Sequence, residues 1–132
     1  MKYVLDTHVW IWGLDSAERL PARVRQLLLE PANLPFGLSA ISPWEALKKE
    51  SLGRLKLSCP GRVWVTRAVR DPFVALLPLG LDVSYEANHL PGSFHRDPAD
   101  QIIVATARLH DLTLITCDRR ILDYGQVRTL WA

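Results

Sequence analysis

The stretch PADQIIVATARLHDLTLITCD, residues 98–118, places a long helical pattern directly before a short apolar strand. Residues 98–110 read as a helix, and Pro98 suits its first turn because the N–H groups there have no acceptor within the helix. LTLIT, residues 112–116, is β-prone, and Asp118 follows it. A helix that leads straight into a short apolar strand indicates an α/β fold with a parallel sheet.

The rest of the chain repeats this alternation. Further strands are expected at 3–6, within 34–42, within 73–79 and at 126–131. Further helices are expected after Asp6, over 18–30, 43–52, 60–70 and 82–90, and as a short turn after Asp118. Gly53 is expected just beyond the end of the helix over 43–52. We therefore expect one domain over residues 1–132, with a parallel sheet and helices on both of its faces.

Composition excludes several classes of protein. Of the 132 residues, 48% are hydrophobic and 23% charged, which excludes a disordered or fibrous chain. The net charge of +2 is too small to indicate nucleic-acid binding by itself. Two cysteines, Cys59 and Cys117, exclude a disulfide scaffold, so we expect reduced thiols and a cytoplasmic location. The most apolar run, FVALLPLGL, is broken by Pro78 and Gly80, and we expect no membrane association.

Acidic residues stand where the strands of such a sheet end. Asp6 follows the first strand and Asp118 follows LTLIT, while Glu45 and Asp100 are expected in the first turns of two helices. Ligands of parallel α/β sheets bind beyond the carboxyl ends of the strands. The alternation of strands and helices therefore predicts that these four carboxylates meet at one end of the sheet.

Each acid by itself also suits a helix cap. Asp6 and Asp118 each precede a helix, and the segments 42–45 and 97–100 both have the layout of a capping box. Asp97 is the clearest cap. Taken together, however, four converging carboxylates repel one another unless a cation binds or their pKa values rise. Ligands that are all oxygen indicate Mg²⁺ or Mn²⁺, which suits metal-dependent hydrolysis of phosphodiesters.

Three segments resemble the PIN-domain family, and most of all the VapC-type toxin ribonucleases of toxin–antitoxin pairs. The segments are LDTHVWIW (5–12), LSAISPWEALKKESLGRL (38–55) and FHRDPADQIIVATARLHDLTLITCD (94–118). The resemblance implies a three-layer α/β/α domain with a short, mainly parallel central sheet. It places the catalytic and metal-binding acids at Asp6, Glu45, Asp100 and Asp118, with Asp97 as a further ligand or a cap. It places Thr7 and Thr116 beside the metal, and His95 and Arg96 are expected near the RNA.

The resemblance also implies an activity and partners. The chain is expected to be an endoribonuclease that cuts RNA with Mg²⁺ or Mn²⁺, to form a homodimer, and to be inhibited by a cognate antitoxin. In the expected mechanism, Asp6 and Asp100 bind the metal most directly and Glu45 and Asp118 complete its shell. One departure is visible: Gln101 stands where this subgroup often has Arg, which removes a positive charge near the cleft.

Two other functions fit the sequence less well. Phosphoaspartyl phosphatases also begin with a strand and an Asp, but they need a second Asp two residues on, where this chain has His8. The sequence has no glycine-rich phosphate loop and no GxSxG elbow. A PIN-like module that binds RNA or protein without cleaving it stays open as an alternative, although the complete set of four acids argues against it.

Overall fold

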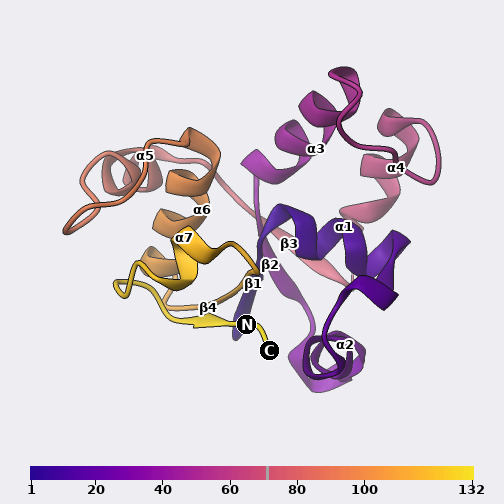
Figure 1. Ribbon diagram of the computed structural model, residues 1–132, viewed down its shortest axis with the longest axis horizontal. Helices are drawn as coiled ribbons and strands as arrows, with labels where there is room; N and C mark the ends of the chain where they lie inside the picture. The colour runs from indigo at the N-terminus through magenta and orange to yellow at the C-terminus, as the bar shows by residue number, and fades with distance from the viewer. Residues whose placement is uncertain (71) are drawn as a thin grey trace.

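The computed structural model describes residues 1–70 and 72–132, and its centre is a five-stranded parallel sheet (Figure 1). The strands are β1 (Tyr3–Leu5), β2 (Phe36–Ser39), β3 (Val74–Leu77), β4 (Thr113–Ile115) and β5 (Thr129–Leu130). The helices are α1 (Thr7–Asp15), α2 (Ala22–Leu29), α3 (Ile41–Ser51), α4 (Gly61–Ala68), α5 (Leu81–Ala87), α6 (Pro98–Leu109) and α7 (Arg119–Leu122). Two 3₁₀ turns span Ala17–Arg19 and Pro31–Asn33. The predicted α/β class and parallel sheet are confirmed.

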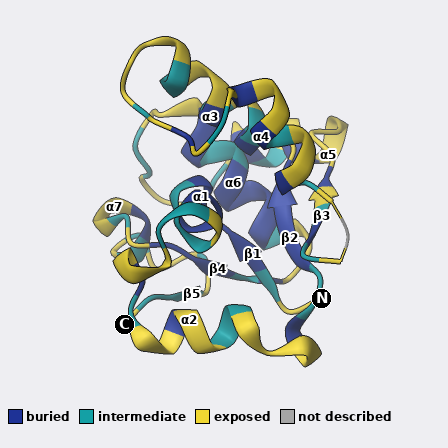
Figure 2. Ribbon diagram, turned by 90° about the vertical axis from the view of Figure 1, so that its right-hand side faces the viewer, coloured by how far each residue is buried: buried dark blue, intermediate teal, exposed yellow. Residues whose placement is uncertain are grey.

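The three inner strands, β1, β2 and β4, are buried on both faces, and alternate residues of β1 and β4 pack into different cores. Leu5 and Ile115 pack with α1, α2, α3 and α4, whereas Val4 and Leu114 pack with α6 and α7. Figure 2 shows the strands as the buried centre and the outer faces of the helices as exposed. Because successive side chains of a strand point to opposite faces, each short apolar run supports two helical layers. The three-layer arrangement follows from this alternation.

The strand order is β3-β2-β1-β4-β5, so the direction of chain progression reverses between β1 and β4. The two strands end side by side, and the Asp6 N–H donates a 3.0 Å hydrogen bond to the Ile115 carbonyl just beyond them. In open α/β sheets the crevice at such a reversal, outside the carboxyl ends of the strands, is the usual binding site. Asp6 therefore stands at the topological switch point.

The helix predicted over 18–30 is wrong in its first part. The chain instead forms a 3₁₀ turn over Ala17–Arg19 and begins α2 only at Ala22. Pro21 explains the break, because it has no N–H to donate and disfavours helical geometry in the residue before it. Leu20 is accordingly extended, with ψ of 143°. None of the helices in the described ranges is long and apolar enough to cross a bilayer.

The predicted start of α3 at Pro43, with Ser42 as its cap, is also wrong. The helix begins at Ile41, whose N–H donates to Ser39 Oγ at 3.2 Å. Ser42 is buried inside the helix, and Pro43 is tolerated because N–H groups of the first turn have no helical acceptor. Glu45 is therefore not a first-turn residue as predicted, and it has no part in a capping box.

The end of α3 is as predicted at Gly53. This glycine has φ of +71°, a left-handed conformation that other residues adopt with strain. Its N–H donates to the Glu50 carbonyl at 3.0 Å, and the Arg54 N–H donates to the Lys49 carbonyl at 2.9 Å. These two bonds form a Schellman motif, which satisfies the last carbonyls of the helix that carries Glu45 and Lys49.

Candidate metal and nucleic-acid site

A cleft of about 260 Å³ lies at the carboxyl end of the sheet, and five carboxylates line it. They come from the ends of β1 and β4, from α3, and from the start of α6. The five are Asp6, Glu45, Asp97, Asp100 and Asp118. The structure therefore brings together all of the acids that the sequence singled out, although they are spread over more than a hundred residues of chain.

Asp6 is fixed in place by both of its carboxylate oxygens. Oδ1 accepts a 2.8 Å hydrogen bond from the Thr7 N–H, and Oδ2 accepts a 2.6 Å bond from the Thr116 hydroxyl. The same Thr116 oxygen accepts the Asp118 N–H at 3.0 Å, which links the two strand ends. Burial raises the pKa of Asp6 above its ordinary value, although these hydrogen bonds oppose the rise. Thr7 also donates to Ser42 Oγ at 2.8 Å, which ties α1 to α3.

Helix capping accounts for three of the five acids. Asp6, Asp97 and Asp118 each accept a hydrogen bond from a backbone N–H in the first turn of α1, α6 and α7 respectively. The predicted cap at Asp97 is confirmed by bonds from the Ala99 and Asp100 N–H groups at 3.0 and 3.3 Å. Capping does not account for Glu45 or Asp100, which accept no such bond and still face the cleft.

Asp100 is a strongly perturbed carboxyl of the cleft. Its residue surface is only 6% exposed, and the pKa of this acid rises to about 8. Burial is the main cause, followed by the negative charges of Asp6, Asp97, Asp118 and Glu45. An acid whose charge is this unfavourable is typical of a functional site, where a bound cation would restore the ionised form.

Two cationic side chains stand at the edges of the acid cluster. Arg120 Nη2 lies 3.3 Å from Asp118 Oδ2 and 3.6 Å from Asp100 Oδ2. On the other side, Lys49 Nζ lies 3.3 Å from Glu45 Oε2 and 3.3 Å from His8 Nε2. Burial and the charge of Lys49 lower the pKa of His8, so this ring is neutral near pH 7 and accepts from Lys49. The cleft therefore combines buried anions with a cationic rim.

Glu45 carries the clearest sign of a missing partner. Its Oε2 pairs with Lys49, but its Oε1 is buried and has no hydrogen-bond partner among the described residues. A buried carboxylate oxygen without a partner is costly, because desolvation is not compensated. A cation or an ordered water in the cleft would satisfy it.

The remaining predicted residues lie at different distances from this cleft. His95 Nε2 lies 3.1 Å from Asp100 Oδ2, at contact distance but without the alignment of a hydrogen bond. Arg96 is exposed and is not among the described residues that line the cleft. Gln101, at the position of the expected Arg, instead donates to the His95 carbonyl at 3.1 Å and holds that loop. The catalytic roles of all these residues stay predictions.

Lys49, Arg120 and His8 are site residues that the sequence analysis does not identify. The spacing of four residues between Glu45 and Lys49, which puts both on one helix face, is the signal that could have found Lys49. Arg120 follows the cap Asp118 by two residues, and nothing in the sequence shows that its side chain turns back toward the acids.

In the described residues, no three side chains form a ready-made cluster around one ion position. Two of the acids are engaged by side chains of the protein instead: Lys49 pairs with Glu45, while Arg120 and His95 contact Asp100. The donor set is nevertheless made of oxygens from several elements, as Mg²⁺ and Mn²⁺ prefer.

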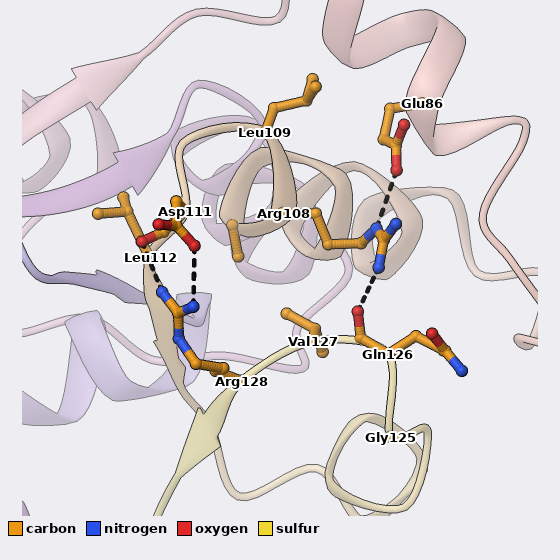
Figure 3. A pocket seen from close by; sticks show the side chains of 10 residues that line it. Glu86, Arg108, Leu109, Asp111, Leu112, Gly125, Gln126, Val127 and Arg128 are labelled. Carbon is orange, nitrogen blue, oxygen red and sulfur yellow. Dashed lines mark hydrogen bonds and ion pairs between the residues drawn. The ribbon is translucent and has the colours of Figure 1, made fainter.

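A larger pocket, about 510 Å³, lies at the other end of the sheet (Figure 3). Its two arginines are already paired within the protein, Arg108 with Glu86 and Arg128 with Asp111, both at 2.8 Å. Asp111 and Arg128 precede β4 and β5, so this pocket faces the amino ends of the strands. Because binding sites of parallel sheets form at the opposite end, the smaller acidic cleft is the candidate functional site.

The fold and the cleft together define an α/β protein with a carboxylate-lined site at the switch point of a parallel sheet. Comparison with known families makes the class specific, because the PIN domain matches residues 3–127. This chain belongs to the PIN-domain family. It is 32% identical over 130 residues to a protein named Ribonuclease VapC22 from Mycobacterium tuberculosis (strain ATCC 25618 / H37Rv), with 97% of each chain covered.

Solved structures agree with the fold. The chain is similar to VapBC2 from Rickettsia felis bound to a DNA fragment from their promoter, with a TM-score of 0.72 at 15% identity and full coverage of both chains. It is also similar to a toxin–antitoxin complex from Klebsiella pneumoniae, with a TM-score of 0.62 at 18% identity and coverage of 98% and 96%. At such identities the likeness concerns the fold alone.

The role of Asp97 can be tested by comparing two substitutions. Asp97→Ala removes the cap of α6 and is expected to lower the free energy of unfolding by about 1 kcal/mol. Asp97→Asn keeps an oxygen that can cap the helix, so it should keep the stability of the native chain. If capping is the whole role of Asp97, this variant should also keep RNA cleavage within a few-fold of the native chain. Chemical denaturation and a cleavage assay measure the two effects. If Asp97→Asn stays stable but loses cleavage, Asp97 is a metal ligand as well as a cap.

Proposed function

We propose that this chain is a divalent-metal-dependent endoribonuclease, the toxin of a toxin–antitoxin pair, which hydrolyses RNA phosphodiester bonds. The observation that carries the proposal is the meeting of Asp6, Glu45, Asp100 and Asp118 in one cleft at the sheet switch point. The relative that supports the activity is named a ribonuclease and is similar over nearly its full length. Acids gathered in this way serve phosphodiester chemistry when a metal ion offsets their charge.

The residues of the cleft fit Mg²⁺ or Mn²⁺. The unpartnered oxygen of Glu45 and the raised pKa of Asp100 both indicate a place for a cation. We propose Asp6 and Asp100 as direct ligands, with Glu45 and Asp118 completing the shell, partly through water. When bound, the divalent ion supplies Lewis acidity, which neutralises charge on a phosphate and lowers the pKa of water.

The protein's own residues then position the groups that react. Thr116 and the Thr7 N–H hold the Asp6 carboxylate in one orientation, so that little reorganisation is needed when a ligand binds. Lys49 and Arg120 both line the cleft together with the acids and can contact phosphates of a bound RNA. His95 Nδ1 accepts the Asp97 N–H at 3.2 Å, so the proton of a neutral ring lies on Nε2, toward Asp100.

We also propose the partners that this class of toxin needs. The similar solved structures are VapBC2 from Rickettsia felis and a toxin–antitoxin complex from Klebsiella pneumoniae, which supports an antitoxin partner for this chain. A homodimer belongs to the same proposal and rests on the resemblance of the sequence to the VapC-type toxins. A cytoplasmic location, with RNA and reduced thiols, belongs to the same proposal.

Cleavage of pooled cellular RNA by the purified protein tests this function. We expect cutting with Mg²⁺ or Mn²⁺ and none with EDTA, because the acids need a divalent ion to act on a phosphate. Primer extension on the products would map the cut sites. If the protein binds metal but cuts nothing in the pool, a narrower substrate must be sought. If it neither binds metal nor cuts, the non-catalytic PIN-like module is the better description.

A further inference from the structure

Arg120 lies between two acids that come from different parts of the fold. One of its terminal nitrogens, Nη2, is 3.3 Å from Asp118 Oδ2 and 3.6 Å from Asp100 Oδ2. Asp118 caps α7, whereas Asp100 belongs to the first turn of α6. A positively charged group placed between two carboxylates of separate elements stands where a bridging cation would stand.

The guanidinium is held only at this point. Its side chain is 59% exposed, and among the described residues it contacts only the carboxylates of these two acids. The backbone N–H of Arg120 separately donates to Asp118 Oδ1 at 2.9 Å, so the cap of α7 does not depend on the side chain. Exposed ion pairs of this kind are weak and are easily exchanged for another cation.

One guanidinium faces several carboxylates at this point. Asp6, Glu45 and Asp97 line the same cleft as Asp100 and Asp118. A single positive charge offsets only one of the two carboxylates that Arg120 contacts, whereas a divalent ion offsets both. Arg120 therefore neutralises part of the acid cluster, and a divalent ion would neutralise more of it.

We propose that Arg120 is a tethered counter-cation that competes with the divalent ion for Asp100 and Asp118 and leaves these carboxylates when the ion binds. The proposal rests on the metal site of the proposed function. Arg120 then affects the affinity for the metal, because its contacts with Asp100 and Asp118 must be broken when the ion binds these two carboxylates. Release from the carboxylates would also leave the guanidinium of Arg120 free to contact the phosphates of an RNA strand.

Metal titration tests the competition directly. Mn²⁺ binding is measured by isothermal titration calorimetry for the native chain, Arg120→Gln and Arg119→Gln at one pH and one salt concentration. Arg119 is the matched control, because it lies on the same helix and its substitution removes the same charge. Within the part of the chain that the structure describes, it pairs only with Asp123, at 3.6 Å. We expect Arg120→Gln to bind Mn²⁺ about three- to tenfold more tightly than the native chain, as the loss of weak surface pairs allows, with Arg119→Gln within about twofold.

A second readout follows the side chain itself. In NMR spectra of the native chain, the Arg120 Nε–H signal, assigned by its absence in Arg120→Gln, should shift and exchange faster with water when Mg²⁺ is added. The Arg119 signal should not change.

The outcomes separate this proposal from the proposed function. If the native chain binds Mn²⁺ but Arg120→Gln binds no more tightly than Arg119→Gln, the competition is overturned and the metal site stands. An Arg120 signal that Mg²⁺ leaves unmoved overturns it as well. If no variant binds either ion, the metal site of the proposed function fails, and the competition fails with it. Circular dichroism of each variant confirms that the fold is kept.

Discussion

An Asp100→Asn variant is expected to lose RNA cleavage by on the order of 10²- to 10³-fold or more, since removing one pre-organised group that stabilises transition-state charge costs about that much. Asp100 is buried at the centre of the acid cluster, in contact with both His95 and Arg120. The amide keeps the size of the side chain but cannot carry the negative charge that holds a divalent ion. Initial rates on an RNA that the native chain cuts measure the loss.

The same charge change outside the cleft provides the control. Asp111 is exposed, pairs with Arg128 at the opposite end of the sheet, and has φ of 55°, a left-handed conformation that Asn tolerates well. Asp111→Asn should therefore keep the native rate. Full activity in Asp100→Asn, or an equal loss in Asp111→Asn, would contradict the assignment of the cleft as the catalytic site.

Asp6→Asn is expected to behave like Asp100→Asn for a different reason. The Asp6 carboxylate accepts from both Thr7 and Thr116, and an amide in its place would direct its NH₂ group at one of these donors or at the cleft. The variant would lose both a negative charge and a fixed orientation. Agreement between the two variants supports one shared metal site.

The gathering of the acids could be predicted from the sequence because a parallel sheet imposes it. Once β1 and β4 are recognised as parallel strands, Asp6 and Asp118 must emerge at the same edge, whatever their separation along the chain. The start of α6 returns to that edge for the same reason, since a crossover helix runs opposite to its strands. Topology alone thus places three of the four proposed catalytic acids.

Glu45 was placed correctly, although by an incorrect argument. It was expected at the edge as a first-turn residue, but α3 begins earlier, and Glu45 reaches the cleft from beyond the first turn. The start of α3 depends on Ser39 and on the burial of Ser42 against Thr7, which are tertiary contacts. Local capping preferences cannot report such contacts.

The cations of the cleft could not be predicted for a related reason. A lysine or arginine in sequence carries no sign of the direction in which its long side chain extends. Lys49 belongs to a run of basic residues that suits a solvated helix face, and the adjacent Lys48 is indeed exposed. Only the packing of α3 against α1, with His8 beside Lys49, distinguishes the two lysines.

The stability of the metal-free protein is expected to fall as the pH rises toward 8, and the raised pKa of Asp100 is one cause. Its pKa is about 8 in the folded chain against about 3.9 in an unfolded one, so the folded state holds this proton more tightly. The stability that the neutral acid provides is complete below pH 4. It is lost progressively as the pH rises through the folded pKa. The raised pKa of Asp6 acts in the same direction.

Comparison with Asp100→Asn isolates this contribution, because the amide does not titrate. Free energies of unfolding are measured by urea denaturation in EDTA from pH 5 to pH 8.5. As the pH rises, the free energy of unfolding of the variant should increase relative to that of the native chain. Near pH 8 the variant should be more stable by on the order of a few kcal/mol. The exposed Asp111→Asn variant should follow the native profile. Parallel profiles for the native chain and Asp100→Asn would show that Asp100 is ionised at little cost in the folded state.

Added Mg²⁺ should stabilise the native chain most at high pH and Asp100→Asn much less. An ion that binds the charged carboxylates offsets the repulsion and the desolvation that make their ionised forms unfavourable in the folded state.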